Sequence, residues 1–138
     1  MNRVDRRSEL REAAFLILFR LDFQGPGSIR EQADDFFDGE DEFTEEEQQI
    51  IFAKVAGTML HVEEIDAALD ELSVGWKTKR MTKVDLTALR LAYYEIKYDD
   101  TVPAATAIND AVELAKSYGT SSSGSFVNGI LAKGVRHE

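Results

Sequence analysis

Apolar side chains recur at helical spacing through almost the whole chain. In the first such segment, a single stripe at i, i+4, i+7, i+8 and i+11 is formed by Leu10, Ala14, Ile17, Leu18 and Leu21. The chain has only two prolines, Pro26 and Pro103, and both stand where such a pattern stops, because proline lacks the N–H that a helix interior needs. We therefore predict an all-α fold, a single-domain bundle of about six or seven helices over residues 1–138.

Caps and breakers predict where the helices begin and end. Thr44 with Glu47 forms a capping box, and Thr82 with Asp85 a second cap. Gly119 follows a helix, at a position where we expect φ > 0. The expected helices are 6–23, a short helix with Ile29, Ala33, Phe36 and Phe37 as its apolar side, a helix after Thr44 that breaks or bends near His61 and continues to Leu72, then 84–98, 104–118 and 123–135. The helix over 84–98 is apolar on nearly every side, which predicts the centre of the bundle.

The composition argues against most catalytic and metal chemistry. The chain has 138 residues, no cysteine and two histidines, so a disulfide framework or thiolate metal site is excluded and a histidine-based site is poorly supplied. The many carboxylates of residues 31–47 lie in a polar segment that we expect to be solvated. Without a pocket, nothing raises the pKa of these carboxyl groups for acid/base catalysis. We expect no enzyme activity, no metal and no cofactor.

The net charge of −10 is unevenly distributed along the chain. Residues 31–50 contain ten Asp and Glu and no Lys or Arg, whereas residues 76–97 contain six Lys and Arg and two Asp and Glu. The acidic segment either is simply a solvated surface or attracts a basic partner protein by its charge. Local charge decides binding more than the sum does, so nucleic acid is not excluded.

One apolar run near the N-terminus faintly resembles a signal peptide. Arg3, Arg6 and Arg7 precede residues 13–19, but charged residues end the run after seven positions. That is far short of the roughly 20 residues that span a bilayer. We read this run as a core helix of a soluble, cytoplasmic protein.

Three ordered blocks resemble the NusB family. They are Trp76 and Arg80 followed by "VDLTALRLAYYEI", then "VPAATAINDAVELAKSYG", then "FVNGIL" at residues 126–131. The opening segment "RRSELREAAFLILFRLDF" is similar to the first helix of the family, and the likeness is weakest over residues 24–60.

The resemblance implies an all-helical, non-enzymatic transcription antitermination factor. Members bind the boxA element of ribosomal RNA leaders, act with the ribosomal protein NusE, and help RNA polymerase read through terminators. A NusB-like domain also opens a class of RNA cytosine methyltransferases that carry a cofactor-binding domain after it. This sequence ends at Glu138 without a Gly-rich nucleotide loop or a cysteine nucleophile, so we expect no such enzyme.

The first helix is one candidate RNA surface. Arg7, Arg11, Phe15 and Phe19 follow one another at i+4 steps, so they would form a ridge that pairs with phosphate and stacks on bases. The alternative is that Phe15 is core and the arginines are only solvated. The resemblance adds Arg6 to the arginine cluster and places Phe19 where relatives often have a tyrosine.

The serine-rich turn before the last helix is the second candidate. Ser122, Ser123 and Ser125 stand at a helix N-terminus, whose free N–H groups favour anions, and Phe126 could stack on a base. The resemblance implies RNA contact by this turn, although Ser125 replaces a lysine of some relatives. The alternative is that the serines only cap the helix and Phe126 packs inside.

Further residues match family positions near the partner surface. We assign Arg80 and Asp85 to NusE binding, beside the simpler reading of Asp85 as a helix cap and Arg80 as an ion-pair partner. Arg90 is expected to pair internally with Glu95 or Glu113, and Trp76 to form a hydrophobic lid.

The rival function is a protein-only interaction module or a homodimer with weak or no RNA binding. The net acidity and the missing lysine at Ser125 favour the rival, whereas the arginines of the first helix favour RNA. In the main reading we expect RNA binding to be weak alone and strengthened by NusE.

Overall fold

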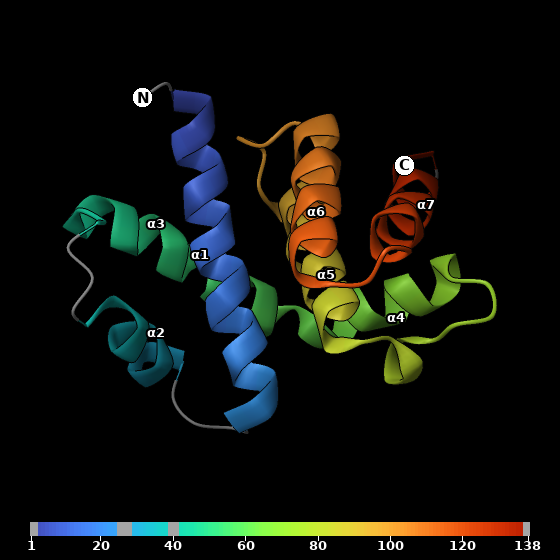
Figure 1. The fold of residues 1–138 in the computed structure, drawn as a ribbon, viewed down its shortest axis with the longest axis horizontal. Coiled ribbons are helices and arrows are strands. Elements are labelled where there is room, and N and C mark those ends of the chain that lie inside the picture. The colour runs from blue at the N-terminus through green and yellow to red at the C-terminus, as the bar shows by residue number, and fades with distance from the viewer. Residues whose placement is uncertain (1–2, 25–28, 39–41, 137–138) are drawn as a thin grey trace.

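A computed structural model describes residues 3–24, 29–38 and 42–136, so Pro26 and the acidic residues Glu40 and Asp41 lie outside the described residues. Within the described part the chain forms seven α-helices, one 3-10 helix and no strand (Figure 1). The helices are α1 (Arg3–Gln24), α2 (Ile29–Phe37), α3 (Glu45–Leu60), α4 (Val62–Leu72), the 3-10 helix η1 (Thr78–Arg80), α5 (Lys83–Tyr98), α6 (Ala104–Tyr118) and α7 (Ser123–Arg136). The predicted all-α class is confirmed.

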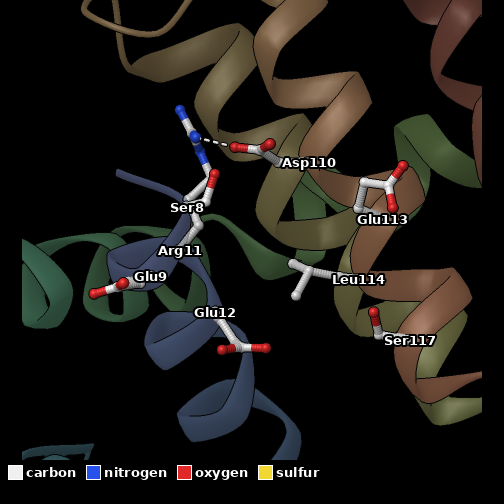
Figure 2. Close-up of a pocket in the computed structure, with 8 residues that line it drawn as sticks. All are labelled: Ser8, Glu9, Arg11, Glu12, Asp110, Glu113, Leu114 and Ser117. Atoms are coloured by element: carbon white, nitrogen blue, oxygen red, sulfur yellow. Dashed lines mark hydrogen bonds and ion pairs between the residues drawn. The ribbon is translucent and has the colours of Figure 1, made fainter. Parts of the chain in front are cut away.

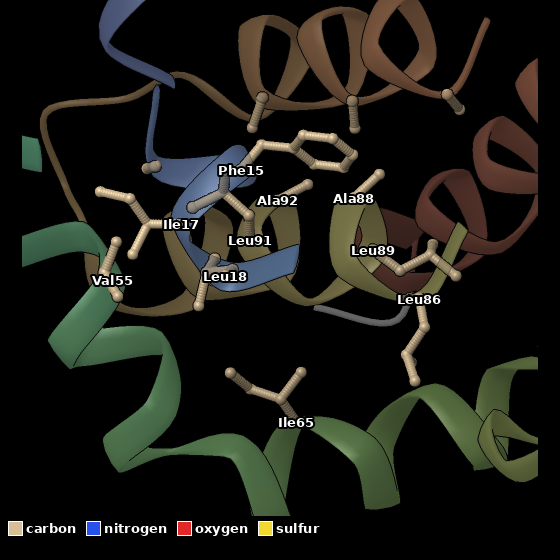
Figure 3. Packing of buried hydrophobic residues seen from close by; sticks show 14 of the residues in the cluster. Phe15, Ile17, Leu18, Val55, Ile65, Leu86, Ala88, Leu89, Leu91 and Ala92 are labelled. Atoms are coloured by element: carbon tan, nitrogen blue, oxygen red, sulfur yellow. The ribbon is translucent and has the colours of Figure 1, made fainter. Parts of the chain in front are cut away.

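Helix α5 lies at the centre, as its all-round apolar character predicts. It packs against α1, α3, α4, α6 and α7. Figure 3 shows Leu86, Leu89 and Leu91 of α5 among the buried side chains that α1, α3 and α4 contribute to the same core. Since α1 also packs against α2 and α3, it joins the α2–α3 part of the molecule to the α5–α7 part.

The local signals place the helix boundaries well. Thr44 accepts a hydrogen bond from the Glu47 N–H at 3.1 Å while the Glu47 carboxylate accepts one from the Thr44 N–H at 3.0 Å, which completes the capping box. Thr82 caps α5 by accepting from the Asp85 N–H at 3.2 Å. Pro103 immediately precedes α6, and His61 separates α3 from α4.

Two details of the sequence reading are wrong. Gly119 has φ −106°, an extended conformation, so it is not the left-handed residue we expected. Glycine is needed there for space, because a Cβ would lie 2.5 Å from the Ser123 hydroxyl oxygen. Arg90 is structural as predicted, but its partners are Asp66, at 2.7 and 2.8 Å, and Asp22 at 3.3 Å.

None of the described helices is long and apolar enough to cross a membrane. The short apolar run of α1 instead faces the protein interior, where Phe15, Ile17 and Leu18 are buried.

Candidate nucleic-acid interface

Arg11 does not lie on a solvent-facing ridge. Its side chain is buried, with the residue 3% exposed. The guanidinium Nε donates to both carboxylate oxygens of Glu95, at 2.8 and 3.0 Å, and Nη1 donates to Asp110. Glu95 is itself 1% exposed and also accepts from Lys54 at 2.7 Å. This network joins α1, α3, α5 and α6, so Arg11 is a structural residue and the predicted ridge is broken here.

Arg6 is also engaged with carboxylates. Its Nε and Nη2 each donate to Glu47 at 2.6 Å, a two-point pair that ties α1 to the start of α3, and Nη1 pairs with Glu9. These hydrogen bonds from Arg6 lower the pKa of Glu47 to about 2. A phosphate at Arg6 would have to compete with this pair.

Arg7 is the exposed arginine of the predicted set on α1. It lines a hollow of about 220 Å³ together with Leu10, Ile50, Lys54 and Thr101. Among the described residues no carboxylate pairs with Arg7. Its guanidinium is therefore available to a phosphate without the loss of an internal ion pair.

The aromatic residues of α1 form a row that leads toward the end of α6. Phe15 is buried, and its ring lies 5.3 Å from that of Tyr118, centroid to centroid. Phe19 is half-buried and contacts Phe23, whose side chain is 64% exposed, at 4.8 Å. The alternative reading of Phe15 as core is correct, while Phe19 keeps a surface position. Sequence reasoning missed Phe23, although it continues the i+4 spacing.

Tyr118 is a second aromatic that the sequence reading missed. Its hydroxyl donates to Glu12 at 2.9 Å, and burial together with this bond raises its pKa. The Phe15–Tyr118 contact brings the aromatic row of α1 close to the serine turn, whose first serine, Ser121, follows Tyr118 by three residues. Nothing in the sequence spacing relates Tyr118 to α1.

The serine turn divides into structural and exposed residues. Ser123 is buried and accepts a hydrogen bond from the Thr120 N–H at 3.0 Å, so it shapes the turn. Ser122 and Ser125 are exposed. Phe126 is half-buried and packs against the core, and its stacking on a base stays a prediction.

The start of α5 meets the serine turn around a hollow of about 330 Å³, which we call the serine-turn hollow. Its lining residues are Trp76, Arg80, Met81, Thr82, Asp85, Ser122 and Phe126. The structure thus unites Ser122 and Phe126 with the two residues that we assigned to partner binding, Arg80 and Asp85. Trp76 is 53% exposed, more than the predicted lid would be, and stands at the edge of this hollow.

An acidic groove runs between α1 and α6. It has a volume of about 320 Å³. Figure 2 shows Glu9 and Glu12 on α1, Asp110 and Glu113 on α6, and the Arg11 guanidinium bonded to Asp110. With Arg11 paired, the carboxylates dominate, and the groove does not suit a phosphate.

The two hollows lie at opposite ends of α5. The Arg7 hollow includes Thr101, just beyond the C-terminus of α5, and the serine-turn hollow includes Thr82 at its N-terminus. A helix of 16 residues is about 24 Å long. Arg7 and the group of Arg80, Asp85, Ser122 and Phe126 therefore line two separate hollows.

Comparison with known proteins identifies the family. The NusB family profile matches residues 8–136. The transcription antitermination protein NusB of Agathobacter rectalis is 50% identical over 127 residues, covering 92% of this chain and 97% of that protein. The protein of the same name from Lachnoclostridium phytofermentans is 48% identical and covers 92% and 96%.

Solved structures share the fold. NusB of T. maritima matches with a TM-score of 0.89 at 29% identity, covering 96% of this chain and 92% of that chain. A crystal structure of the antitermination factors NusB and NusE in complex with double-stranded RNA matches with a TM-score of 0.87 at 26% identity, with complete coverage of both chains. Sequence and fold agree over nearly the full length, and the chain belongs to the NusB family.

Proposed function

We propose that this protein is a transcription antitermination factor that binds boxA-type single-stranded RNA together with NusE. It acts in the cytoplasm as an RNA-binding adaptor for RNA polymerase rather than as an enzyme. The NusB family membership supports this function, as does the solved NusB–NusE complex with RNA that shares its fold. The observation that carries the RNA contact is the serine-turn hollow, which combines exposed Trp76 and Arg80 with Phe126 and a serine hydroxyl.

Each of these groups suits one part of a single-stranded RNA. Aromatic rings stack on unpaired bases whatever their sequence, and arginine pairs with phosphate. In this proposal the RNA-facing residues are Arg7, Phe19, Trp76, Arg80, Ser122, Ser125 and Phe126, and contact of Arg80 with NusE is the alternative. Arg6 contributes only if RNA displaces Glu47, whereas Arg11 and Ser123 act indirectly by holding α1 and the turn in place.

NusE is proposed to strengthen the weak affinity that this protein alone has for RNA. The net charge of −10 and the internal pairing of Arg6 and Arg11 leave few phosphate contacts to the protein alone. The assignment of Arg80 and Asp85 to NusE stays a prediction, as does attraction of this basic partner by the acidic segment 31–47.

The second candidate is a protein-only interaction module, either with NusE or with a second copy of the chain. The acidic α1–α6 groove favours it, because the groove repels a strand that would join the Arg7 hollow to the serine-turn hollow. In that case the hollows serve protein contacts and RNA binding is absent.

Fluorescence anisotropy of a short boxA-like RNA, titrated with and without NusE, tests the proposed function. We expect weak binding alone and tighter binding with NusE, both reduced by Arg7→Ala and by Arg80→Ala. Lys133→Ala, which removes an exposed charge on α7 away from the hollows, is the matched control and should bind normally. If the RNA stays unbound while this protein and NusE associate, the adaptor function is wrong and the protein-only interaction module is supported.

A further inference from the structure

The side chain of Tyr118 joins the last residue of α6 to α1. Its hydroxyl donates a hydrogen bond of 2.9 Å to the Glu12 carboxylate, and its ring lies 5.3 Å from the buried ring of Phe15, centroid to centroid. Tyr118 is nevertheless 43% exposed, so much of its ring gains nothing from burial. The hydrogen bond to Glu12 is therefore needed to fix where this side chain lies.

This bond holds a part of α6 that the other contact across the acidic groove does not reach. Arg11 bonds to Asp110, whereas Glu12 bonds to Tyr118, eight residues further along α6. Eight residues of an α-helix rise by about 12 Å. Figure 2 shows the two neighbouring side chains of α1 pointing apart, with Arg11 directed toward Asp110 and Glu12 away from it. The Glu12–Tyr118 bond therefore holds the C-terminal end of α6.

The C-terminal end of α6 is also where the serine turn begins. Within the turn, the Thr120 N–H donates to the Ser123 hydroxyl at 3.0 Å, and the Ser123 N–H donates to the Thr120 carbonyl at 3.1 Å. These bonds close the turn on itself, but they do not fix its place relative to α1. Tyr118 stands directly before the turn and contacts α1, so it supplies this link.

We propose that Glu12 and Tyr118 are positioning residues for RNA binding, whose hydrogen bond holds the serine turn at a fixed place relative to the aromatic row of α1. The inference rests on the proposed RNA-binding function and deepens it. Neither residue has to touch the RNA. A turn that is ordered before binding spares the complex the entropy loss of ordering it. Burial and the bond to Glu12 raise the pKa of Tyr118, so the hydroxyl stays protonated and remains a donor at neutral pH.

Glu12 has two effects on RNA binding, and they have opposite signs. Its negative charge repels phosphate, so removal of the charge should tighten binding. Its carboxylate accepts from Tyr118, so removal of the acceptor should weaken binding. Glu12→Gln and Glu12→Ala remove the same charge, but only Glu12→Gln keeps an oxygen that can accept the hydrogen bond. The ratio of their RNA affinities therefore measures the hydrogen bond at constant charge.

The test is fluorescence anisotropy of a short boxA-like RNA titrated with each variant in the presence of NusE. We expect Glu12→Gln to bind at least as tightly as the wild type. Glu12→Ala should bind about three- to tenfold more weakly than Glu12→Gln, the range that one hydrogen bond supplies. Tyr118→Phe keeps the ring and removes only the hydroxyl, so in this background the ratio should fall to about one.

Glu113→Gln and Glu113→Ala are the matched control pair. Glu113 lines the same acidic groove and is exposed, and its printed contact is with Lys116 of its own helix. The two Glu113 variants should therefore bind RNA equally. Circular dichroism and urea titration establish that every variant is folded under the binding conditions, so that a change in affinity is not a loss of folded protein.

The outcomes separate this inference from the proposed function. A ratio near one for the Glu12 variants, or a ratio that persists in Tyr118→Phe, overturns the positioning role while RNA binding stands. The role is also overturned if Tyr118→Phe binds like the wild type and Tyr118→Leu binds weakly, since the ring and not the hydroxyl would then act. Absence of RNA binding by the wild type with NusE present overturns both.

Discussion

Replacing Arg11 should destabilise the fold rather than remove an RNA contact. In Arg11→Ala, Glu95 loses two hydrogen bonds of 2.8 and 3.0 Å while remaining buried, and Asp110 loses its cation. Removing one partner of a buried ion pair costs about 3–5 kcal/mol. Lys54 remains within 2.7 Å of Glu95 and Asp110 is partly exposed, so the lower end, about 3 kcal/mol, applies here.

The control is Arg7→Ala, one turn earlier on the same helix. Arg7 is exposed and unpaired with any described carboxylate, so its replacement should change the free energy of unfolding by no more than about 0.5 kcal/mol. Urea titration followed by circular dichroism measures both variants. We expect the midpoint to fall for Arg11→Ala at an unchanged slope, since the folded and unfolded states keep their exposed areas.

RNA binding completes the comparison. Arg7→Ala should weaken RNA binding without loss of stability, whereas folded Arg11→Lys, which keeps a charge but not the two-point fork, should bind RNA normally. The reasoning is refuted if Arg11→Ala unfolds within about 1 kcal/mol of the wild type. It is also refuted if Arg11→Lys weakens RNA as much as Arg7→Ala does.

Three further results are expected. Arg6 lowers the folded-state pKa of Glu47 to about 2, so the stabilisation from this pair is present above about pH 4.5 and is lost as the pH falls toward 2. The free energy of unfolding should therefore fall less steeply with acidification in Glu47→Gln than in the wild type. An identical pH profile would contradict the Arg6 pairing. Gly119→Ala should lower the free energy of unfolding by about 1–3 kcal/mol, because its Cβ would lie 2.5 Å from the Ser123 hydroxyl oxygen; a neutral effect in urea titration would argue against this close approach. Arg80→Ala should reduce the slope of log affinity against log salt by about 0.7, the value for one phosphate contact on a single strand; an unchanged slope would exclude a phosphate at Arg80.

The helices were predictable because their signals are local. The capping box at Thr44, the cap at Thr82 and the proline before α6 each act on residues within one turn. The interacting residues are therefore close together in the sequence and can be recognised from it. The all-round apolar character of α5 likewise predicted its central place, since such a helix must be covered on every side.

The candidate site was predictable only in part. Sequence spacing put Arg7 and Arg11 on one ridge, and the resemblance to the NusB family selected the serine turn. Spacing could not separate the exposed Arg7 from the buried Arg11, because both positions suit a polar residue at the edge of an apolar stripe. Phe23 could have been found from its i+4 spacing to Phe19, whereas no sequence signal relates Tyr118 to Phe15.

The sequence by itself determined the all-α class, the helix boundaries and the family, since these depend on short-range patterns and on the order of motifs. Tertiary structure decided which polar groups are available to a ligand. Arg11 is withdrawn from solvent by Glu95 and Asp110, 84 and 99 positions away. Asp85 lines a hollow only because α7 brings Phe126 beside α5. Burial and ion pairing are properties of distant segments in contact, and local sequence does not encode which segments will meet.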